Sequence, residues 1–258
     1  MKRRSLLSLL LLTMVLSAAP AWADVAADHY NRGNRLFADG QYAEALAAYQ
    51  AALDSGADDA AAYLNFGNAA FRLNEVGLAI WAYEMGLRLE PRNDDLRFNL
   101  RYAGAFMRDE LPPADEVFIL RVGRALAGHF TADEALAGAA AGWLLGGLAV
   151  LLWGPWRRFR RRTIALGVLG ALLLAFFAPI AAVNVHRQAV LARAVVVADE
   201  VVVRTGPAQT AKEAFTVHAG MRLELIETRD DYTRARIPTG FEGWLPTETY
   251  RALRRDVE

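Results

Sequence analysis

Residues 31–53 read NRGNRLFADGQYAEALAAYQAAL, and residues 65–87 repeat the pattern as NFGNAAFRLNEVGLAIWAYEMGL. The second stretch begins 34 positions after the first. An internal period of 20 to 50 residues is typical of stacked structural repeats, in which each unit buries its apolar face against the next. The identities that recur at this offset are Asn31, Gly33, Asn34, Phe37, Ala45, Tyr49 and Leu53, which return as Asn65, Gly67, Asn68, Phe71, Ala79, Tyr83 and Leu87.

The repeated small and aromatic residues predict pairs of antiparallel helices. Two helices approach closely only where a side chain is tiny, as at Gly33 and Ala45, and an aromatic such as Tyr49 then fills the adjoining gap. Pro91 stands where the second helix of the second unit is expected to end. This pattern resembles the tetratricopeptide (TPR) family, which implies helical hairpins whose first helices line a concave binding surface.

The repeats predict a TPR domain over residues 24–110, with two repeats plus a capping helix. Residues 94–108 keep Asn99 in register with Asn31 and Asn65 but carry Arg101 in place of the glycine. A third, single helix is therefore expected to cover the apolar end of the stack.

The first 23 residues have the pattern of a secretory signal peptide. A cationic start is followed by an apolar run from Leu6 to Leu16 and by Ala21-Trp22-Ala23. Cleavage after Ala23 and retention as an uncleaved signal anchor both place Asp24 outside the cytoplasm.

Two apolar segments predict transmembrane helices over residues 136–153 and 163–183. They hold 18 and 21 residues without a charge, enough to span about 30 Å of hydrocarbon at about 1.5 Å per residue. The loop 154–162 between them contains five arginines and no acid, so the positive-inside rule places it in the cytoplasm, with lipid headgroup contact as a compatible addition. These topogenic residues are Arg157, Arg158, Arg160, Arg161 and Arg162.

Residues 114–130 form an amphipathic pattern between the TPR domain and the first span. Two interpretations are equally compatible with it: a juxtamembrane helix that lies in the membrane interface, and an ordinary helix packed on the TPR domain.

The last segment changes from helical periodicity to short β-rich runs. Five runs, at residues 195–197, 201–203, 223–226, 233–237 and 243–245, are separated by turn sequences. Their order, with Thr205-Gly206-Pro207 and later Gly243-Trp244-Leu245-Pro246, resembles the bacterial SH3 (SH3b) family, with Tyr232 where that family commonly has tryptophan. The sequence therefore predicts a multidomain α plus β fold: N-terminal TPR α-hairpin repeats, two transmembrane helices and, over residues 190–255, a C-terminal SH3-like small β-barrel.

This order of segments resembles the BatE family, the TPR/SH3b membrane proteins of Bacteroides-aerotolerance (Bat) operons. The resemblance implies partners rather than chemistry, namely membrane proteins with von Willebrand factor A (VWA) domains and a MoxR-type ATPase. It also implies a bacterial inner-membrane location, with the TPR and SH3b domains on the periplasmic side.

The repeated asparagines are the candidate partner-binding residues of the TPR domain. Asn31 and Asn34 share a helix face, as do Asn65 and Asn68, and Asn99 extends the row. Asparagine amides both donate and accept hydrogen bonds, which suits an extended peptide backbone. The alternative is that these amides bridge neighbouring helices. Tyr30, Asp95 and Asn99 occupy the positions that are basic in carboxylate-clamp TPR domains, which argues against such a clamp.

In the C-terminal domain, Tyr232 and Trp244 are candidate contacts for a peptide or for cell-wall glycopeptide. Together with Phe241 they could line an aromatic surface, whereas aromatics in a small β-domain commonly belong to the core. We expect Trp244 to be structural and Tyr232 to be the exposed contact.

No pattern in the sequence points to catalysis, a metal or a cofactor. The chain has no cysteine, and its four histidines fall in separate segments without metal-ligand spacing. Residues 24–135 carry 10 basic and 18 acidic residues, a net charge of −8, which disfavours nucleic acid as a partner. The sequence thus predicts a non-catalytic, membrane-anchored periplasmic scaffold that binds protein partners. The alternative function is a peptidoglycan-binding sensor that acts through the SH3b domain.

Overall fold

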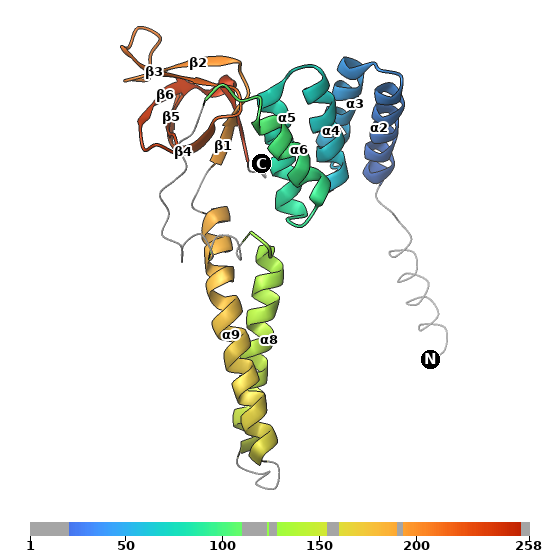
Figure 1. Cartoon of the computed structure of the whole chain (residues 1–258), viewed down its shortest axis with the longest axis vertical. Coiled ribbons are helices and arrows are strands. Elements are labelled where there is room, and N and C mark those ends of the chain that lie inside the picture. Colours follow the sequence, from blue (N-terminus) through green and yellow to red (C-terminus); the bar gives the residue numbers. More distant parts are fainter. Residues whose placement is uncertain (1–20, 110–122, 124–127, 154–159, 190–192, 254–258) are drawn as a thin grey trace, which may run out of the picture.

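The computed structural model describes residues 21–109, 123, 128–153, 160–189 and 193–253. They form an N-terminal helical domain, a long helical hairpin and a C-terminal antiparallel sheet (Figure 1). The helical domain and the sheet lie side by side at one end of the hairpin (Figure 1). Residues 1–20 of the predicted signal peptide, most of the predicted 114–130 helix and the Arg157–Arg158 pair lie outside the described residues.

Five helices build the N-terminal domain. They are α2 (Ala21–Ala38), α3 (Tyr42–Asp54), α4 (Ala60–Arg72), α5 (Val76–Leu89) and α6 (Asp94–Gly104). The pairs α2–α3 and α4–α5 are helical hairpins, and α6 packs on α5 in the region where the capping helix is predicted. The turn inside each hairpin contains a residue with left-handed backbone, Gly40 (φ 76°) and Asn74 (φ 65°), 34 positions apart. Glycine and asparagine are the residues that adopt this conformation most readily.

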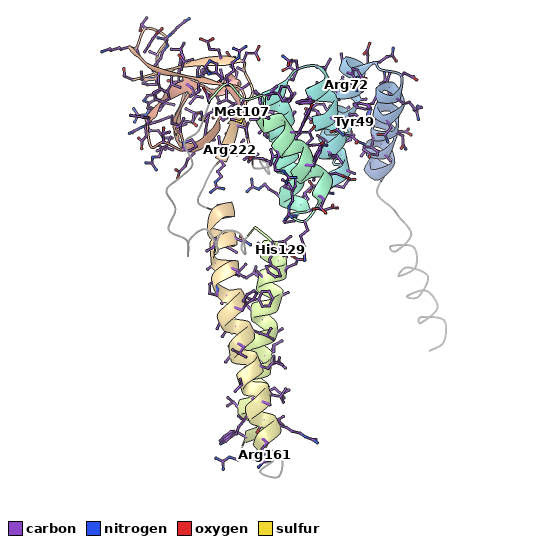
Figure 2. All side chains as sticks on the ribbon, viewed as in Figure 1. Tyr49, Arg72, Met107, His129, Arg161 and Arg222 are labelled. Carbon is purple, nitrogen blue, oxygen red and sulfur yellow. The ribbon has the colours of Figure 1, made fainter. Side chains whose placement is uncertain are left out.

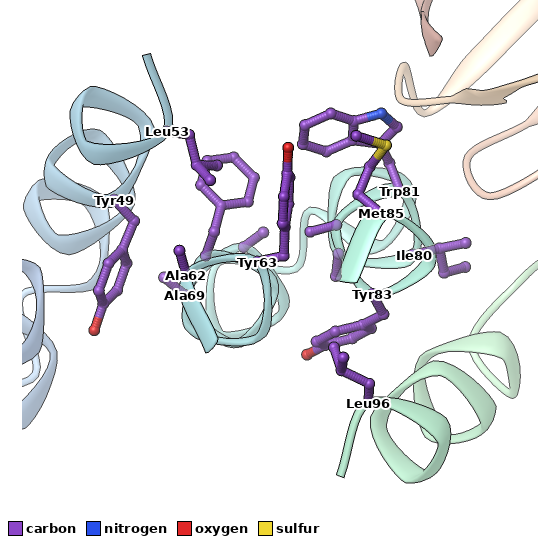
Figure 3. Close-up of a cluster of buried hydrophobic side chains, with 14 of the residues drawn as sticks. Tyr49, Leu53, Ala62, Tyr63, Ala69, Ile80, Trp81, Tyr83, Met85 and Leu96 are labelled. Atoms are coloured by element: carbon purple, nitrogen blue, oxygen red, sulfur yellow. The ribbon is translucent and has the colours of Figure 1, made fainter. Parts of the chain in front are cut away.

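The glycine–tyrosine contact inside each hairpin has the predicted packing role. A Cβ atom added to Gly33 would lie 2.5 Å from the ring of Tyr49, and one added to Gly67 would lie 2.5 Å from the ring of Tyr83. Both tyrosines are fully buried in the helical core. Figure 3 shows this core, with Tyr83 between α5 and Leu96 of α6.

The helical hairpin consists of α8 (Ala132–Trp153) and α9 (Arg160–Ala189). Both helices are long and apolar enough to cross a membrane. Their backbones meet at Gly142 and Gly170, where an added Cβ would lie 2.7 Å from the Leu174 nitrogen and from the Gly142 carbonyl oxygen, respectively. Large apolar side chains point outward instead of into this contact, and Val150 is 76% exposed.

The C-terminal domain is one antiparallel sheet of seven strands in the order β3-β2-β6-β5-β4-β1-β7. The strands are β1 (Arg193–Val196), β2 (Glu200–Arg204), β3 (Glu213–His218), β4 (Arg222–Arg229), β5 (Tyr232–Arg236), β6 (Glu242–Pro246) and β7 (Tyr250–Ala252). The five predicted runs all contribute to strands, while β3 and β7 lie outside these runs. Within the described chain the edge strands β3 and β7 do not pair with each other, so the sheet is not closed. The SH3-like barrel therefore stays a prediction.

The sheet packs directly against α5 of the helical domain. The Trp81 Nε1–H donates a hydrogen bond to the Ala252 carbonyl oxygen at 2.8 Å. Gly77 lies against the backbone of Val196 and Val197, where a Cβ atom would clash. Val195 and Leu253 are buried in the same apolar cluster as the helices. The two domains thus share a core, which the sequence analysis did not anticipate.

Polar contacts reinforce this docking. The Arg251 guanidinium lies 4.9 Å from the centre of the Trp81 ring and donates to Gln50 Oε1 at 3.0 Å. Asp109, just beyond α6, accepts a hydrogen bond from the His218 backbone N–H at 2.8 Å, and its other oxygen lies 2.7 Å from His218 Nδ1. The sheet is therefore held at both α5 and the end of the helical domain.

We predict that Gly67→Ala destabilises the helical domain, because the new methyl group would displace the buried Tyr83 ring. Overpacking of this kind costs about 1–3 kcal/mol. Gly104→Ala is the matched control, since nothing lies within 4 Å of its added Cβ. Thermal unfolding of the purified full chain in detergent should show a lower Tm for Gly67→Ala only. Equal Tm values for the two variants would contradict the packing role.

We also predict that Trp81→Phe loosens the sheet from the helices, because it removes the hydrogen bond to Ala252 and part of the ring under Arg251. Hydrogen exchange measured by mass spectrometry should be faster in β7. The same substitution at Trp143, which is 70% exposed on the hairpin, is the control and should leave β7 protected. Unchanged β7 exchange in Trp81→Phe would show that this contact does not hold the sheet.

Candidate functional site

Four of the five repeated asparagines form a network that follows the 34-residue period. Asn34 Oδ1 accepts hydrogen bonds from the Tyr49 hydroxyl at 2.9 Å and from Asn65 Nδ2 at 3.1 Å. One repeat later, Asn68 Oδ1 accepts from the Tyr83 hydroxyl at 3.0 Å and from Asn99 Nδ2 at 3.0 Å. The side-chain oxygens of Asn34 and Asn68 therefore each join the two helices of one hairpin to the first helix of the next unit.

This network gives the asparagines a structural role, the alternative that the sequence left open. Asn65 also donates to the Tyr30 hydroxyl at 2.9 Å, which ties it further to α2. Asn31 differs because its side chain is exposed and no hydrogen bond is recorded for it within the described part of the chain. Contact between these asparagines and a partner stays a prediction, for which Asn31 has the most accessible side chain.

The tyrosines of the network stay protonated in neutral solution. Burial raises the pKa of Tyr49 to about 12, with a smaller contribution from neighbouring Tyr30. Burial also raises the pKa of Tyr83 well above its ordinary value. Because both phenols keep their protons, they act as donors, and the asparagine oxygens are the acceptors.

An exposed aromatic row lies beside the asparagines, on α6 and in the turn that follows it. Phe98 and Tyr102 are 60% and 52% exposed and lie four residues apart on one face of α6, and Phe106, in the turn after the helix, is 51% exposed. Neighbouring rings are in contact, with centroids 6.2 Å apart for Phe98 and Tyr102 and 5.3 Å apart for Tyr102 and Phe106. Phe71 of α4 packs against Tyr102 and Phe106 at 5.4 and 5.3 Å.

Sequence reasoning missed this row, although its spacing was visible. The buried face of α6 is occupied by Leu96 and Ala103. These two positions leave Phe98 and Tyr102 on another side of the helix, so helical periodicity alone predicts that both rings point outward. Phe106 lies beyond the end of the helix, and periodicity does not place it.

Together these residues define the α2–α4–α6 face, which combines amide groups with exposed aromatic rings. Contiguous apolar surface of this kind is unusual on a soluble domain and marks interaction sites. Aromatic rings supply a large contact area, and neighbouring amides pair with peptide groups. The residues of the face are Tyr30, Asn31, Asn34, Asn65, Asn68, Phe71, Phe98, Asn99, Tyr102 and Phe106.

The structure separates the aromatic residues that were expected to act together in the C-terminal domain. Trp244 is buried, with the Arg229 guanidinium 5.4 Å from its ring centre, in agreement with a structural role. Tyr232 is half-buried and lines a cavity of about 760 Å³ with Glu200, Arg204 and Asp231. Trp244 does not line this cavity. Phe241 instead packs against Phe215 at 6.2 Å.

The described arginines of the topogenic group lie at the hairpin end that is remote from the two soluble domains. Figure 2 marks this end by Arg161 and the opposite end by His129. Arg160, Arg161 and Arg162 are all exposed, and the Arg160 guanidinium lies 5.1 Å from the centre of the Trp153 ring.

Within the described ranges, no group of three or more histidine, aspartate or glutamate side chains is placed to hold a metal ion. His218 is engaged with Asp109 at the interdomain contact.

Comparison with protein families identifies a TPR repeat over residues 33–74, which run from the middle of α2 to the turn after α4. No curated protein matches the chain. The chain thus contains a TPR repeat, and TPR repeats are modules of protein–protein interaction.

We predict that Asn68→Ala destabilises the helical domain more than Asn31→Ala does. The first substitution leaves the buried Tyr83 hydroxyl and the Asn99 amide without their acceptor, and an unpaired buried polar group costs about 1–3 kcal/mol. Asn31 is exposed, so its replacement should be close to neutral. Thermal unfolding of both variants in detergent tests the difference. Similar Tm values would mean that the network adds nothing to stability.

Proposed function

We propose that this protein is a non-catalytic, membrane-anchored scaffold whose α2–α4–α6 face binds a protein partner on the periplasmic side of the bacterial inner membrane. The observation that carries the proposal is the row of exposed aromatic residues on α6, beside the asparagines of the TPR helices. Interfaces are enriched in aromatic residues, and a few such side chains commonly provide most of the binding energy.

The hairpin supports membrane anchoring. Its 22-residue and 30-residue helices exceed the roughly 20 residues that cross a bilayer. The arginines at its remote end favour the cytoplasm under the positive-inside rule. This orientation puts the helical domain and the sheet together on the opposite side, with the hairpin as their common anchor.

The resemblance to the BatE family supports a specific class of partner. It points to membrane proteins with VWA domains, in a complex that includes a MoxR-type ATPase. The net charge of −8 over residues 24–135 favours a partner segment that is basic as well as apolar, because opposite charge speeds productive encounter.

The cavity at Tyr232 favours the second candidate function, binding of peptidoglycan through the C-terminal domain. Its volume of about 760 Å³ and its polar lining, which includes Gln209 and Thr247, suit a glycopeptide fragment. Retention on purified sacculi, lost in Tyr232→Ala, would support this function over the scaffold.

Site-specific crosslinking in intact cells tests the scaffold. A photoreactive residue at Tyr102 should capture a VWA-domain membrane protein, whereas one at exposed Glu44 on α3 should not. Capture of glycan or wall peptide through Tyr232 alone would favour the wall-binding function. Equal capture of the VWA protein from Tyr102 and Glu44 would contradict binding at this face.

We predict that Phe98→Ala weakens binding of the captured partner about tenfold, since loss of one well-packed aromatic contact costs at least 1 kcal/mol. Phe241→Ala is the matched control, because Phe241 is 67% exposed but belongs to the C-terminal domain. Affinity is measured with purified full-length proteins in detergent. The α2–α4–α6 face is excluded as the binding surface if both variants bind like the unmodified protein.

A further inference from the structure

A small polar cavity lies where the helical domain, the sheet and the hairpin meet. Its volume is about 200 Å³. Arg88 of α5 and Arg193 of β1 contribute its basic side chains, and Glu84 of α5 contributes an acidic one. Thr131 and Asn184 line it from the ends of the hairpin helices. The scaffold function proposed above makes no use of this cavity.

Arg88 lacks an ion-pair partner in the part of the chain that the structure describes. The nearest acidic influence is Glu84, whose carboxylate is already bound to the Arg222 guanidinium. Burial lowers the pKa of Arg88, and the positive charge of Arg193 lowers it further. The negative charge of Glu84 raises this pKa and offsets part of the shift. The guanidinium groups of half-buried Arg88 and exposed Arg193 therefore repel each other.

Arg193 is not neutralised by its own neighbours on the sheet either. It stands opposite Glu224 in the β1–β4 ladder, but the Glu224 carboxylate pairs with Arg236 at 3.3 Å. The cavity lining thus holds two cations, Arg88 and Arg193, against the single carboxylate of Glu84, which is also paired with Arg222 outside the lining.

The cavity lies at the depth where a membrane surface would meet the soluble domains. Thr131 caps the start of α8 by accepting a hydrogen bond from the Glu134 N–H at 3.1 Å, and Asn184 of α9 donates to the Phe130 carbonyl oxygen at 2.9 Å. An ion pair between Arg92 and Glu134 joins the helical domain to this end of the hairpin. In Figure 2, Arg222 lies on the side of the sheet that faces this end of the hairpin, whereas Arg161 lies at the other end of the hairpin.

We propose that Arg88 and Arg193 bind the phosphate of an anionic phospholipid headgroup, in the membrane leaflet next to the two soluble domains. Guanidinium groups bind phosphate oxygens through paired, charge-assisted hydrogen bonds. A volume of about 200 Å³ is below that of pockets for drug-sized ligands and suits a single phosphate group. The inference rests on the membrane anchoring in the proposed function.

Native mass spectrometry of the full-length protein in detergent tests the site with phosphatidylglycerol and phosphatidylethanolamine as probes. The double variant Arg88→Gln/Arg193→Gln should retain about tenfold less phosphatidylglycerol than the unmodified protein. The control Arg35→Gln/Arg101→Gln removes the same charge from exposed positions outside the cavity and should retain it normally. The unmodified protein, the double variant and the control all keep the arginine-rich loop 154–162. Lipid bound at that loop is therefore the same in all three and does not affect the comparison of retained phosphatidylglycerol. Equal retention by the double variant and the control would overturn the proposal.

Thermal unfolding gives a second, independent readout. In lipid-free detergent the double variant should be at least as stable as the unmodified protein, because the repulsion between the two arginines is relieved. Phosphatidylglycerol should raise the Tm of the unmodified protein but not that of the double variant. If inorganic phosphate raises the Tm as much as the lipid does, the site takes a free anion and the headgroup assignment is wrong. If the double variant fails to fold, Arg193→Gln alone should show the same loss of lipid retention.

Carbonate extraction of membranes separates this inference from its premise. Release of the protein by carbonate would contradict membrane anchoring itself. Retention in the membrane together with unchanged lipid binding in the double variant would contradict the headgroup site alone.

Discussion

The contact between α5 and the strands β1 and β7 constrains the whole molecule. α5 precedes the hairpin in sequence and β1 follows it, so the Trp81–Ala252 contact joins segments on both sides of α8 and α9. Such a contact can form only if both segments lie at the same end of the hairpin. The chain must therefore turn back after α8, and α9 must run antiparallel to it. If the hairpin crosses a membrane, the interface by itself requires the two soluble parts to share one side.

The same contact determines which surfaces remain open. α5 packs through Tyr83 and Gly86 toward α4 and α6, and through Gly77 and Trp81 toward the sheet. α5 is covered on both sides, whereas the α2–α4–α6 face stays accessible. Docking of the sheet thus leaves the exposed aromatic row uncovered, at a fixed position relative to the hairpin.

The helical domain was largely predictable because its determinants are local and periodic. The spacing from Asn34 to Tyr49 recurs from Asn68 to Tyr83, so the repeat itself predicts the bonded pairs once glycine fixes the distance between helices. The interdomain contact had no such signal. Trp81 and Gly77 show only that one side of this helix is buried. They do not show whether another repeat or a sheet covers it, and Ala252, the partner of Trp81, is 171 residues away in the sequence. β3 and β7 were missed for a related reason, since an edge strand pairs on one side only and needs no strong β-rich run.

The aromatic row on α6 is the feature that packing within the chain explains least. The last helix of a repeat stack normally presents a polar surface, because no further repeat covers it. α6 meets this expectation at Asp95 and Arg101, which are exposed, but breaks it at Phe98 and Tyr102, and Phe106 in the following turn adds a third exposed ring. The fully buried residues of α6 are Leu96 and Ala103. Tyr102 and Phe106 also pack against Phe71, yet all three rings remain more than half exposed. Exposed apolar residues that do not complete the core of their own chain are expected at surfaces that bind a partner. That departure is the physical reason to place binding on the α2–α4–α6 face rather than on the asparagines alone, whose amides are already bonded to one another.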